Sequence, residues 1–153
     1  MATKQRIFCD TNYLLDVFDA DREFHADAIA LLWFASENPD TVELLASITS
    51  FKDSYYILTR LYRDELQARD SISSIMGVYV QPVDMLAHYG REALESREPD
   101  FEDALIATCA LHEGASTIVT RDEKAFATCG IPALSAAEFL KQVDFDYSKI
   151  DIG

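Results

Sequence analysis

The sequence lacks any apolar run that approaches the roughly 18 residues of a membrane-spanning helix. The opening residues, MATKQR, are polar and lead into a strand-like run rather than into the apolar core of a secretion signal. We therefore expect a cytoplasmic protein that does not associate with membranes. Nearly half of the 153 residues are apolar, which is enough for the core of one globular domain.

Cysteine is scarce. The three cysteines, Cys9, Cys109 and Cys129, are an odd number and show no paired spacing. Two of them lie in apolar runs, which is typical of buried free thiols rather than of a disulfide or a zinc site. Redox chemistry therefore has little support.

Basic residues are also few, with 13 lysines and arginines against 27 aspartates and glutamates and a formal net charge of −14. This balance argues against the broad basic surface by which most proteins hold nucleic acid. Most of the excess acid is expected to form a solvated surface.

The most informative stretch runs from Asp100 to Asp122. Residues 103–112 are apolar on nearly every side, which is typical of a helix packed in a core, and Gly114 ends it. Residues 116–120 are a short β-branched run, as in a parallel strand covered on both faces. Asp122 follows that strand, and Asp103 lies in the first turn of the helix. Ligands of open parallel sheets bind beyond the carboxyl ends of the strands, where Asp122 is expected to lie.

Other parts of the chain repeat this arrangement. Asp10 follows a buried strand at residues 6–9, and Ser50 is expected to cap a helix with Asp53 in its first turn. A strand is expected at 78–83, and Asp84 is expected to cap the helix after it. Further helices are expected at about 14–18, 25–36, 64–76 and 123–128 and after Ser135, with further strands at 42–46 and 131–134.

Strands and helices alternate throughout, so we predict the α/β class: a single domain with a mainly parallel central sheet flanked by helices. The domain is expected to cover residues 1–143, followed by a loose C-terminal tail at 144–153.

Four aspartates, Asp10, Asp53, Asp103 and Asp122, are thus expected at one edge of the sheet. Clustered carboxylates raise one another's pKa values, and a divalent cation relieves the repulsion. Oxygen-only ligands favour Mg²⁺ or Mn²⁺ over zinc. Such an ion activates water and neutralises charge on a phosphodiester, so the chemistry indicated is metal-dependent phosphoryl hydrolysis.

Each acid taken singly has an ordinary alternative. Aspartate after a strand often begins a turn, and in a first helical turn it is favoured by the helix dipole. Asp100 is as well explained as an N-cap. Arg121 is expected to form a surface ion pair rather than to contact phosphate. The three histidines, His25, His88 and His112, lack the spacing of a ligand set and are expected to be structural or exposed.

Three motifs together resemble the PIN-domain nucleases, best known as the toxins of VapBC-type toxin–antitoxin pairs. They are Ile7–Asn12, Asp100–Leu105 and Ile118–Asp122 with Phe126, and their order fits the family over about residues 5–142. The resemblance implies a magnesium-dependent endoribonuclease of the cytoplasm. It also implies an RNA substrate, an antitoxin protein as a candidate partner, and a homodimer.

The resemblance assigns the metal to Asp10, Asp103 and Asp122. The family commonly has a glutamate in the middle helix, where this sequence has Asp53. Asn12, Asp100 and Thr120 are auxiliary candidates that orient ligands or water.

Two other functions remain open. One is a non-catalytic PIN-like binding or assembly module, favoured by the aspartate in place of glutamate and by the negative charge. The other is a different metal-dependent phosphohydrolase, such as a phosphatase, or a receiver-type domain, which also gathers acids at strand ends. A receiver domain needs a lysine after a late strand, where this chain has Arg121 and Asp122.

Overall fold

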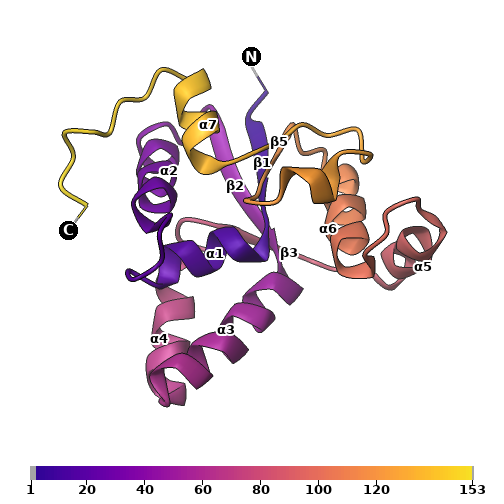
Figure 1. Cartoon of the computed structure of the whole chain (residues 1–153), viewed down its shortest axis with the longest axis horizontal. Helices are drawn as coiled ribbons and strands as arrows, with labels where there is room; N and C mark the ends of the chain where they lie inside the picture. Colours follow the sequence, from indigo (N-terminus) through magenta and orange to yellow (C-terminus); the bar gives the residue numbers. More distant parts are fainter. Residues whose placement is uncertain (1–2, 153) are drawn as a thin grey trace.

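A computed structural model describes residues 3–152 and has an α/β architecture with a central five-stranded sheet (Figure 1). The strands are β1 (Gln5–Cys9), β2 (Val42–Ser47), β3 (Gln81–Val83), β4 (Thr117–Val119) and β5 (Ala133–Leu134). They lie in the order β3-β2-β1-β4-β5, and all neighbours are parallel. The predicted single domain with a mainly parallel sheet is therefore confirmed.

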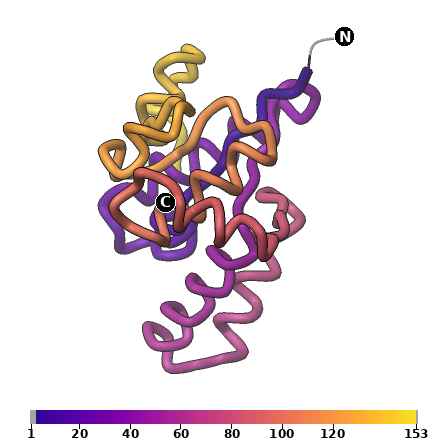
Figure 2. The backbone as a smooth tube through the Cα atoms, turned by 90° about the vertical axis from the view of Figure 1, so that its right-hand side faces the viewer, coloured from indigo at the N-terminus to yellow at the C-terminus, as the bar shows by residue number. Residues whose placement is uncertain are grey.

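Helices flank the sheet on both faces. They are α1 (Thr11–Phe18), α2 (His25–Glu37), α3 (Ile48–Tyr62), α4 (Glu65–Ile75), α5 (Ala87–Glu95), α6 (Phe101–His112) and α7 (Ala136–Gln142), with a short 3-10 helix, η1 (Glu123–Phe126). Helices α3 and α4 pack on each other and project below the sheet as an arm (Figures 1 and 2). Within the described residues, no helix has the length and apolarity that crossing a membrane requires.

The two-residue period of the strands divides the core into two clusters. Ile7 and Cys9 point into a cluster shared with α1, α2 and α7, whereas Phe8 points into a cluster shared with α5, α6 and η1. All three side chains are fully buried. A sheet that is buried on both faces needs apolar residues at successive positions, which is why its strands read as continuous apolar runs.

The start of α3 differs from the prediction. Ser47, the last residue of β2, is the N-cap, and its hydroxyl accepts the backbone N–H of Ser50 at 3.1 Å. Ser50 lies inside the helix, so Asp53 lies in the second turn and not in the first. Serine is an acceptable N-cap at either position. Ser47 is the cap because β2 extends to this residue and α3 follows it without a loop.

The region between α4 and α6 also differs from the prediction. The strand expected at 78–83 is limited to Gln81–Val83, and Pro82 suits this edge position because it has no N–H to donate. Asp84 does not cap α5. The helix begins at Ala87 after Leu86, which makes no side-chain cap hydrogen bond.

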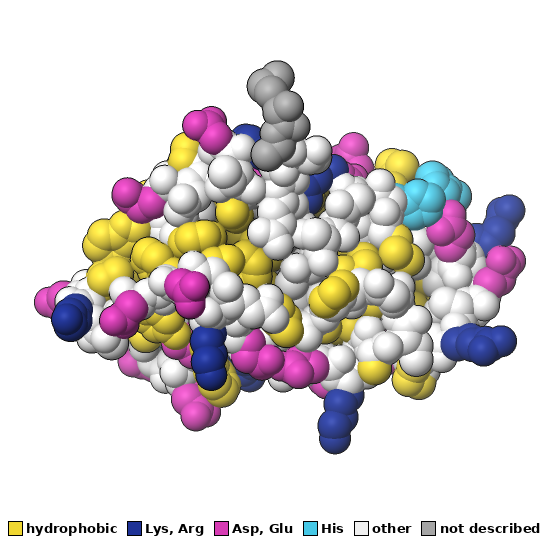
Figure 3. Space-filling model, turned by 90° about the horizontal axis from the view of Figure 1, so that it is seen from above, with side chains coloured by type: hydrophobic (Ala, Val, Ile, Leu, Met, Phe, Trp, Pro, Cys, Tyr) yellow, Lys and Arg dark blue, Asp and Glu magenta, His cyan; other side chains and the backbone are white. Residues whose placement is uncertain are grey.

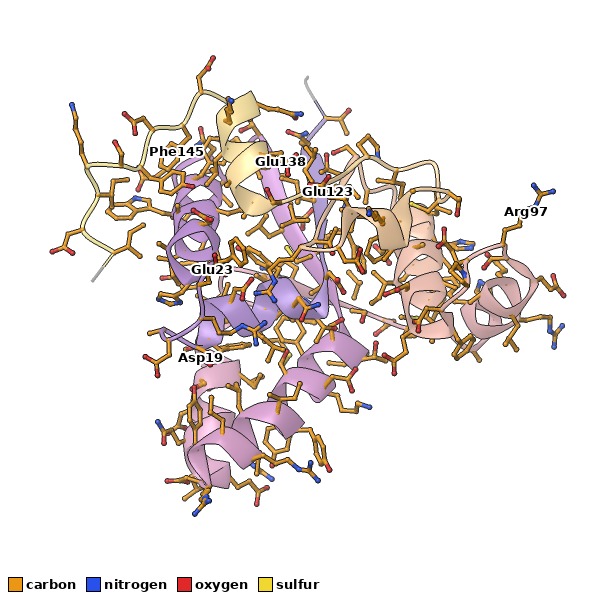
Figure 4. The ribbon with its side chains drawn as sticks, in the orientation of Figure 1. Asp19, Glu23, Arg97, Glu123, Glu138 and Phe145 are labelled. Carbon is orange, nitrogen blue, oxygen red and sulfur yellow. The ribbon has the colours of Figure 1, made fainter. Side chains whose placement is uncertain are left out.

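The tail expected from Asp144 onward has no helix or strand, yet it lies along α2. Phe145, which is labelled in Figure 4, packs edge-on against Phe34 at 5.3 Å between ring centroids. The Tyr147 hydroxyl donates to Asp27 at 2.6 Å. Residues 1, 2 and 153, which the predicted domain and tail included, lie outside the described residues.

Candidate metal centre at the carboxyl edge of the sheet

Parallel pairing of β1 with β4 brings Asp10 and Thr120 together. Cys9 is paired with Val119, and the backbone N–H of Asp10 donates to the Val119 carbonyl at 3.0 Å. Both strands therefore end at the same level, and the next residue of each begins the site. Asp10 is also the N-cap of α1 and is only 8% exposed.

Hydrogen bonds hold the Asp10 carboxylate in one orientation. Its Oδ1 accepts the Thr11 N–H at 2.7 Å, and its Oδ2 accepts the Thr120 hydroxyl at 3.0 Å. The Thr120 Oγ1 in turn accepts the backbone N–H of Asp122 at 3.0 Å. Thr120 therefore links the two aspartates that follow β1 and β4, and its auxiliary role at the site stays a prediction.

Helix α6 brings Asp103 to the same edge. Asp100 is its N-cap, with Oδ1 accepting the Asp103 N–H at 3.0 Å, so the N-cap interpretation of Asp100 is confirmed. The pKa of Asp103 is raised from 3.8 to about 6, first by burial and then by the negative charges of Asp100, Asp10, Asp122 and Glu102. Asp103 therefore lies among four acidic side chains whose charges all act to raise its pKa.

Asp10 has the same kind of environment. Burial raises its pKa most, and the charge of Asp122 adds to this, while the hydrogen bonds from Thr11 and Thr120 lower it. The structure thus brings Asp10, Asp103 and Asp122 into mutual electrostatic contact, although their role as ligands stays a prediction. Asp122 itself is exposed and caps η1 through the Ala125 N–H.

A cleft of about 600 Å³ opens beside these acids, between α1, α3 and α6. Its walls include four of the predicted site residues: Asp10, Asn12, Asp53 and Asp103. Cavities of this size are typical of ligand sites. Asp53 is half-buried on this wall, and its Oδ1 lies 2.8 Å from the Lys52 ammonium. Asp53 therefore faces the cleft, with a lysine beside it.

The cleft is also lined by Lys52 and Phe101, which the sequence analysis did not single out as site residues, and by Tyr56. The pKa of Lys52 is raised mainly by Asp53, through their hydrogen bond and charge, and slightly by Glu102. Tyr56 is 56% exposed, and the guanidinium of Arg60 lies 4.6 Å from its ring centroid. Whether the Tyr56 ring is buried or exposed depends on which face of α3 packs against α1, and only the tertiary structure shows this face.

Arg121 pairs with an acid that the sequence interpretation did not single out. Both Arg121 and Arg22 contact Asp16 Oδ1, at 3.2 and 2.7 Å, and Asp16 is buried. Arg121 therefore forms an ion pair as expected, but its partner is buried and not at the surface. A signal was present, because a charged residue inside the apolar run Tyr13–Val17 needs a partner when it is buried.

The donor set suits a hard divalent cation. Three carboxylates offer oxygen ligands only, and the pKa of Asp103 is raised first by burial and then by neighbouring negative charges, whose repulsion a cation would remove. Among the described residues, the oxygens of these aspartates are not gathered within 4.8 Å of one another.

Comparison with known proteins agrees with this geometry. A family model described as PIN domain matches residues 6–124. The chain is 25% identical over 143 residues to Ribonuclease VapC1 of Aquifex aeolicus (strain VF5), covering 90% of this chain and 95% of that protein.

Solved structures share the fold. VapC20 of Mycobacterium tuberculosis, a sarcin-ricin loop cleaving toxin, superposes with a TM-score of 0.62 at 22% identity, covering 82% of this chain and 95% of that one. VapBC2 from Rickettsia felis, bound to a promoter DNA fragment, gives 0.67 at 17% identity, covering 86% and 98%. The family match spans most of the chain and includes Asp10, Asp103 and Asp122, and the chain belongs to the PIN-domain family.

Proposed function

We propose that the protein is a metal-dependent endoribonuclease that hydrolyses RNA phosphodiester bonds, and that it is the toxin of a toxin–antitoxin pair acting in the cytoplasm. The observation that carries the proposal is the meeting of Asp10, Asp103 and Asp122 at the carboxyl edge of the sheet, where the pKa of Asp103 is raised to about 6. The similarity to a ribonuclease over nearly the whole chain supports RNA as the substrate.

In this proposal Asp10, Asp103 and Asp122 hold Mg²⁺ or Mn²⁺. The ion, when bound, supplies an activated water and neutralises charge on the phosphodiester. The Thr120 hydroxyl and the Thr11 N–H keep the Asp10 carboxylate oriented toward the site. Asp53 takes the place of the family's glutamate on the opposite wall of the cleft.

The cleft provides contacts for RNA in spite of the overall negative charge. Lys52 adds a positive charge at its wall, and the exposed rings of Tyr56 and Phe101 offer faces on which bases stack. Arg60 lies over the Tyr56 ring and places a second cation there. Single-stranded nucleic acid is bound by this combination of cations and aromatic side chains.

The outer face of α3 supports a protein partner. Ile57 and Leu61, four residues apart on one face of this helix, are both exposed, and Ile57 borders the cleft. Exposed apolar side chains rimmed by polar residues mark protein interaction sites. An antitoxin that covers this face would also obstruct the cleft. A homodimer is the second assembly that we propose, as in the resemblance noted above.

The test is RNA cleavage by the purified protein. We expect cleavage of a structured RNA with Mg²⁺ or Mn²⁺, none with a chelator, and none by Asp10→Asn. Asp40→Asn, in the loop before β2, serves as the matched control because it removes a carboxylate outside the site. Cleavage that Asp10→Asn leaves unchanged would contradict the proposal. Hydrolysis of p-nitrophenyl phosphate without RNA cleavage would favour the other phosphohydrolases.

A further inference from the structure

Helices α5 and α6 bring together three metal-binding side chains that are distant in the sequence. His88 and Glu92 are one turn apart on α5, and His112 is the last residue of α6. One ligand atom from each lies within 4.8 Å of the other two, and all three residues are exposed. Histidine side chains gather at the surface over this part of the molecule, next to acidic side chains (Figure 3). His88 and His112 are exposed, as the sequence analysis expected, and their closeness to each other depends on the packing of α5 against α6 and not on sequence spacing.

Neighbouring contacts fix the cluster. The Nε2 of His112 lies 2.8 Å from Glu92 Oε2, and the His112 ring stacks on Tyr89 at 4.5 Å between centroids. Tyr89 is buried, so it anchors the imidazole to the body of the protein. The His88 ring meets the His112 ring edge-on at 5.5 Å. The three side chains are therefore already directed toward one another.

We propose that His88, Glu92 and His112 form a second metal site, for a transition-metal cation of the zinc class. Two imidazole nitrogens and one carboxylate, with water in the fourth position, are a ligand set that zinc accepts. Imidazole selects zinc, nickel, copper or cobalt over Mg²⁺, which prefers oxygen. The chemistry of this site is therefore different from that of the acidic site.

Only small movements are needed to close the site. Ligand atoms around a tetrahedral zinc are roughly 3.3 Å apart, given zinc–ligand distances of about 2.0–2.1 Å. The three ligand atoms lie within 4.8 Å of one another, so the remaining approach is small, and the exposed His88 and Glu92 side chains can supply it while Tyr89 holds His112. The i, i+4 spacing of His88 and Glu92 places both on one face of α5.

The site lies far from the acidic edge. His112 is nine residues after Asp103 on α6, which corresponds to roughly 13 Å along the helix. A metal there would link α5 to the end of α6 opposite to the one that carries Asp103. Its effect is thus to clamp the two helices together and not to take part in hydrolysis.

The test uses zinc itself as the probe and removes the acidic site first. We expect an Asp10→Asn/Asp103→Asn variant of the full chain to bind one equivalent of Zn²⁺ by isothermal titration calorimetry in excess Mg²⁺. Saturating Zn²⁺, at about 100 times its dissociation constant, should raise the melting temperature by about 5 °C. Bound Co²⁺ should show the visible absorption of a site with nitrogen ligands.

Substitutions then identify the ligands. In the same background, His88→Gln and Glu92→Gln should each weaken Zn²⁺ binding at least tenfold, whereas His25→Gln, outside the cluster, should not. Circular dichroism shows that each variant is folded. Absence of stoichiometric zinc binding overturns the proposal. So does zinc binding that survives both His88→Gln and Glu92→Gln, since the site would then lie elsewhere.

Discussion

The two ends of α6 carry opposite electrostatic arrangements. The N-terminal end presents Asp100, Glu102 and Asp103, and the C-terminal end presents His112. Both arrangements suit the helix dipole, which favours acids at the first turn and cationic groups at the last. By this local criterion, neither end needs a function to explain it.

The tertiary contacts of the two ends of α6 differ. The Nε2 of His112 lies within hydrogen-bond distance of the Glu92 carboxylate, at 2.8 Å. Asp103, by contrast, is repelled by the negative charges of Asp10 and Asp122. A satisfied pair contributes modestly to stability by itself. Repulsion among carboxylates costs stability, and the proposed cation would remove that cost. The comparison of the two ends of α6 shows that the candidate metal centre is distinguished by carboxylates lying close to one another, and not simply by the presence of acidic residues.

The largest effect is expected from Asp103→Asn. This change keeps the shape and removes the charge, so RNA cleavage should fall by about 100-fold or more. Asp100→Asn, three residues earlier, is the matched control and should leave cleavage intact. Single-turnover cleavage assays measure both. If Asp100→Asn abolishes cleavage while Asp103→Asn does not, the opposite face of α6 carries the site.

Divalent metal should stabilise the wild-type protein. Mg²⁺ or Mn²⁺ at about 100 times its dissociation constant adds about 2.7 kcal/mol to the free energy of unfolding, which raises the melting temperature by about 5 °C. Asp103→Asn should remove most of this shift. Differential scanning fluorimetry measures it. No shift at millimolar metal in the wild type would favour the non-catalytic module.

The raised pKa of Asp103 predicts a pH dependence in the absence of metal. The folded protein holds this proton up to about pH 6, and the unfolded chain loses it near 3.8. Asp103 therefore lowers the free energy of unfolding as pH rises from about 4 to 6, by about 1–2 kcal/mol after solvent screening of a half-exposed group. Asp103→Asn should be more stable than the wild type above pH 6 and should lose this advantage near pH 4. Urea unfolding across this range decides it, and a constant difference would contradict the assigned pKa.

Asp100→Ala should have the smallest effect. It removes the cap hydrogen bond to the Asp103 N–H and should cost about 1 kcal/mol of stability. Asp100→Asn keeps that bond and should cost only a few tenths. Urea denaturation compares the two. An equal loss in both would mean that the charge, and not the hydrogen bond, supports the helix.

Much of the fold could be predicted from local patterns. Continuous apolar runs identified β1 and β4, and the apolar helix between Asp103 and His112 is α6. Alternation of strands and helices implied parallel pairing, and parallel pairing brings the ends of β1 and β4 to one edge. The closeness of Asp10 to Asp122 was therefore predictable, because chain order and connection rules suffice for it.

Helix boundaries were less predictable where two caps were possible. Ser47 and Ser50 have the same side chain, and only the pairing of β2 with β1 and β3 extends the strand to Ser47. The position of Asp53 in the second turn of α3 follows from that choice. Similarly, the composition of residues 78–83 favoured a strand over the whole range, but β3, at the edge of the sheet, is limited to Gln81–Val83.

By itself, the sequence determined the α/β class, the order of the elements and the carboxyl-edge placement of Asp10 and Asp122. These features depend on periodicity and chirality along the chain, which are local. The tertiary structure alone decided that Asp16 pairs with Arg121 and that His88 and Glu92 meet His112. Those contacts join residues at least 20 positions apart. They arise when helices pack by their apolar faces, and the polar side chains that meet at the rims of these contacts leave no periodic signal in the sequence.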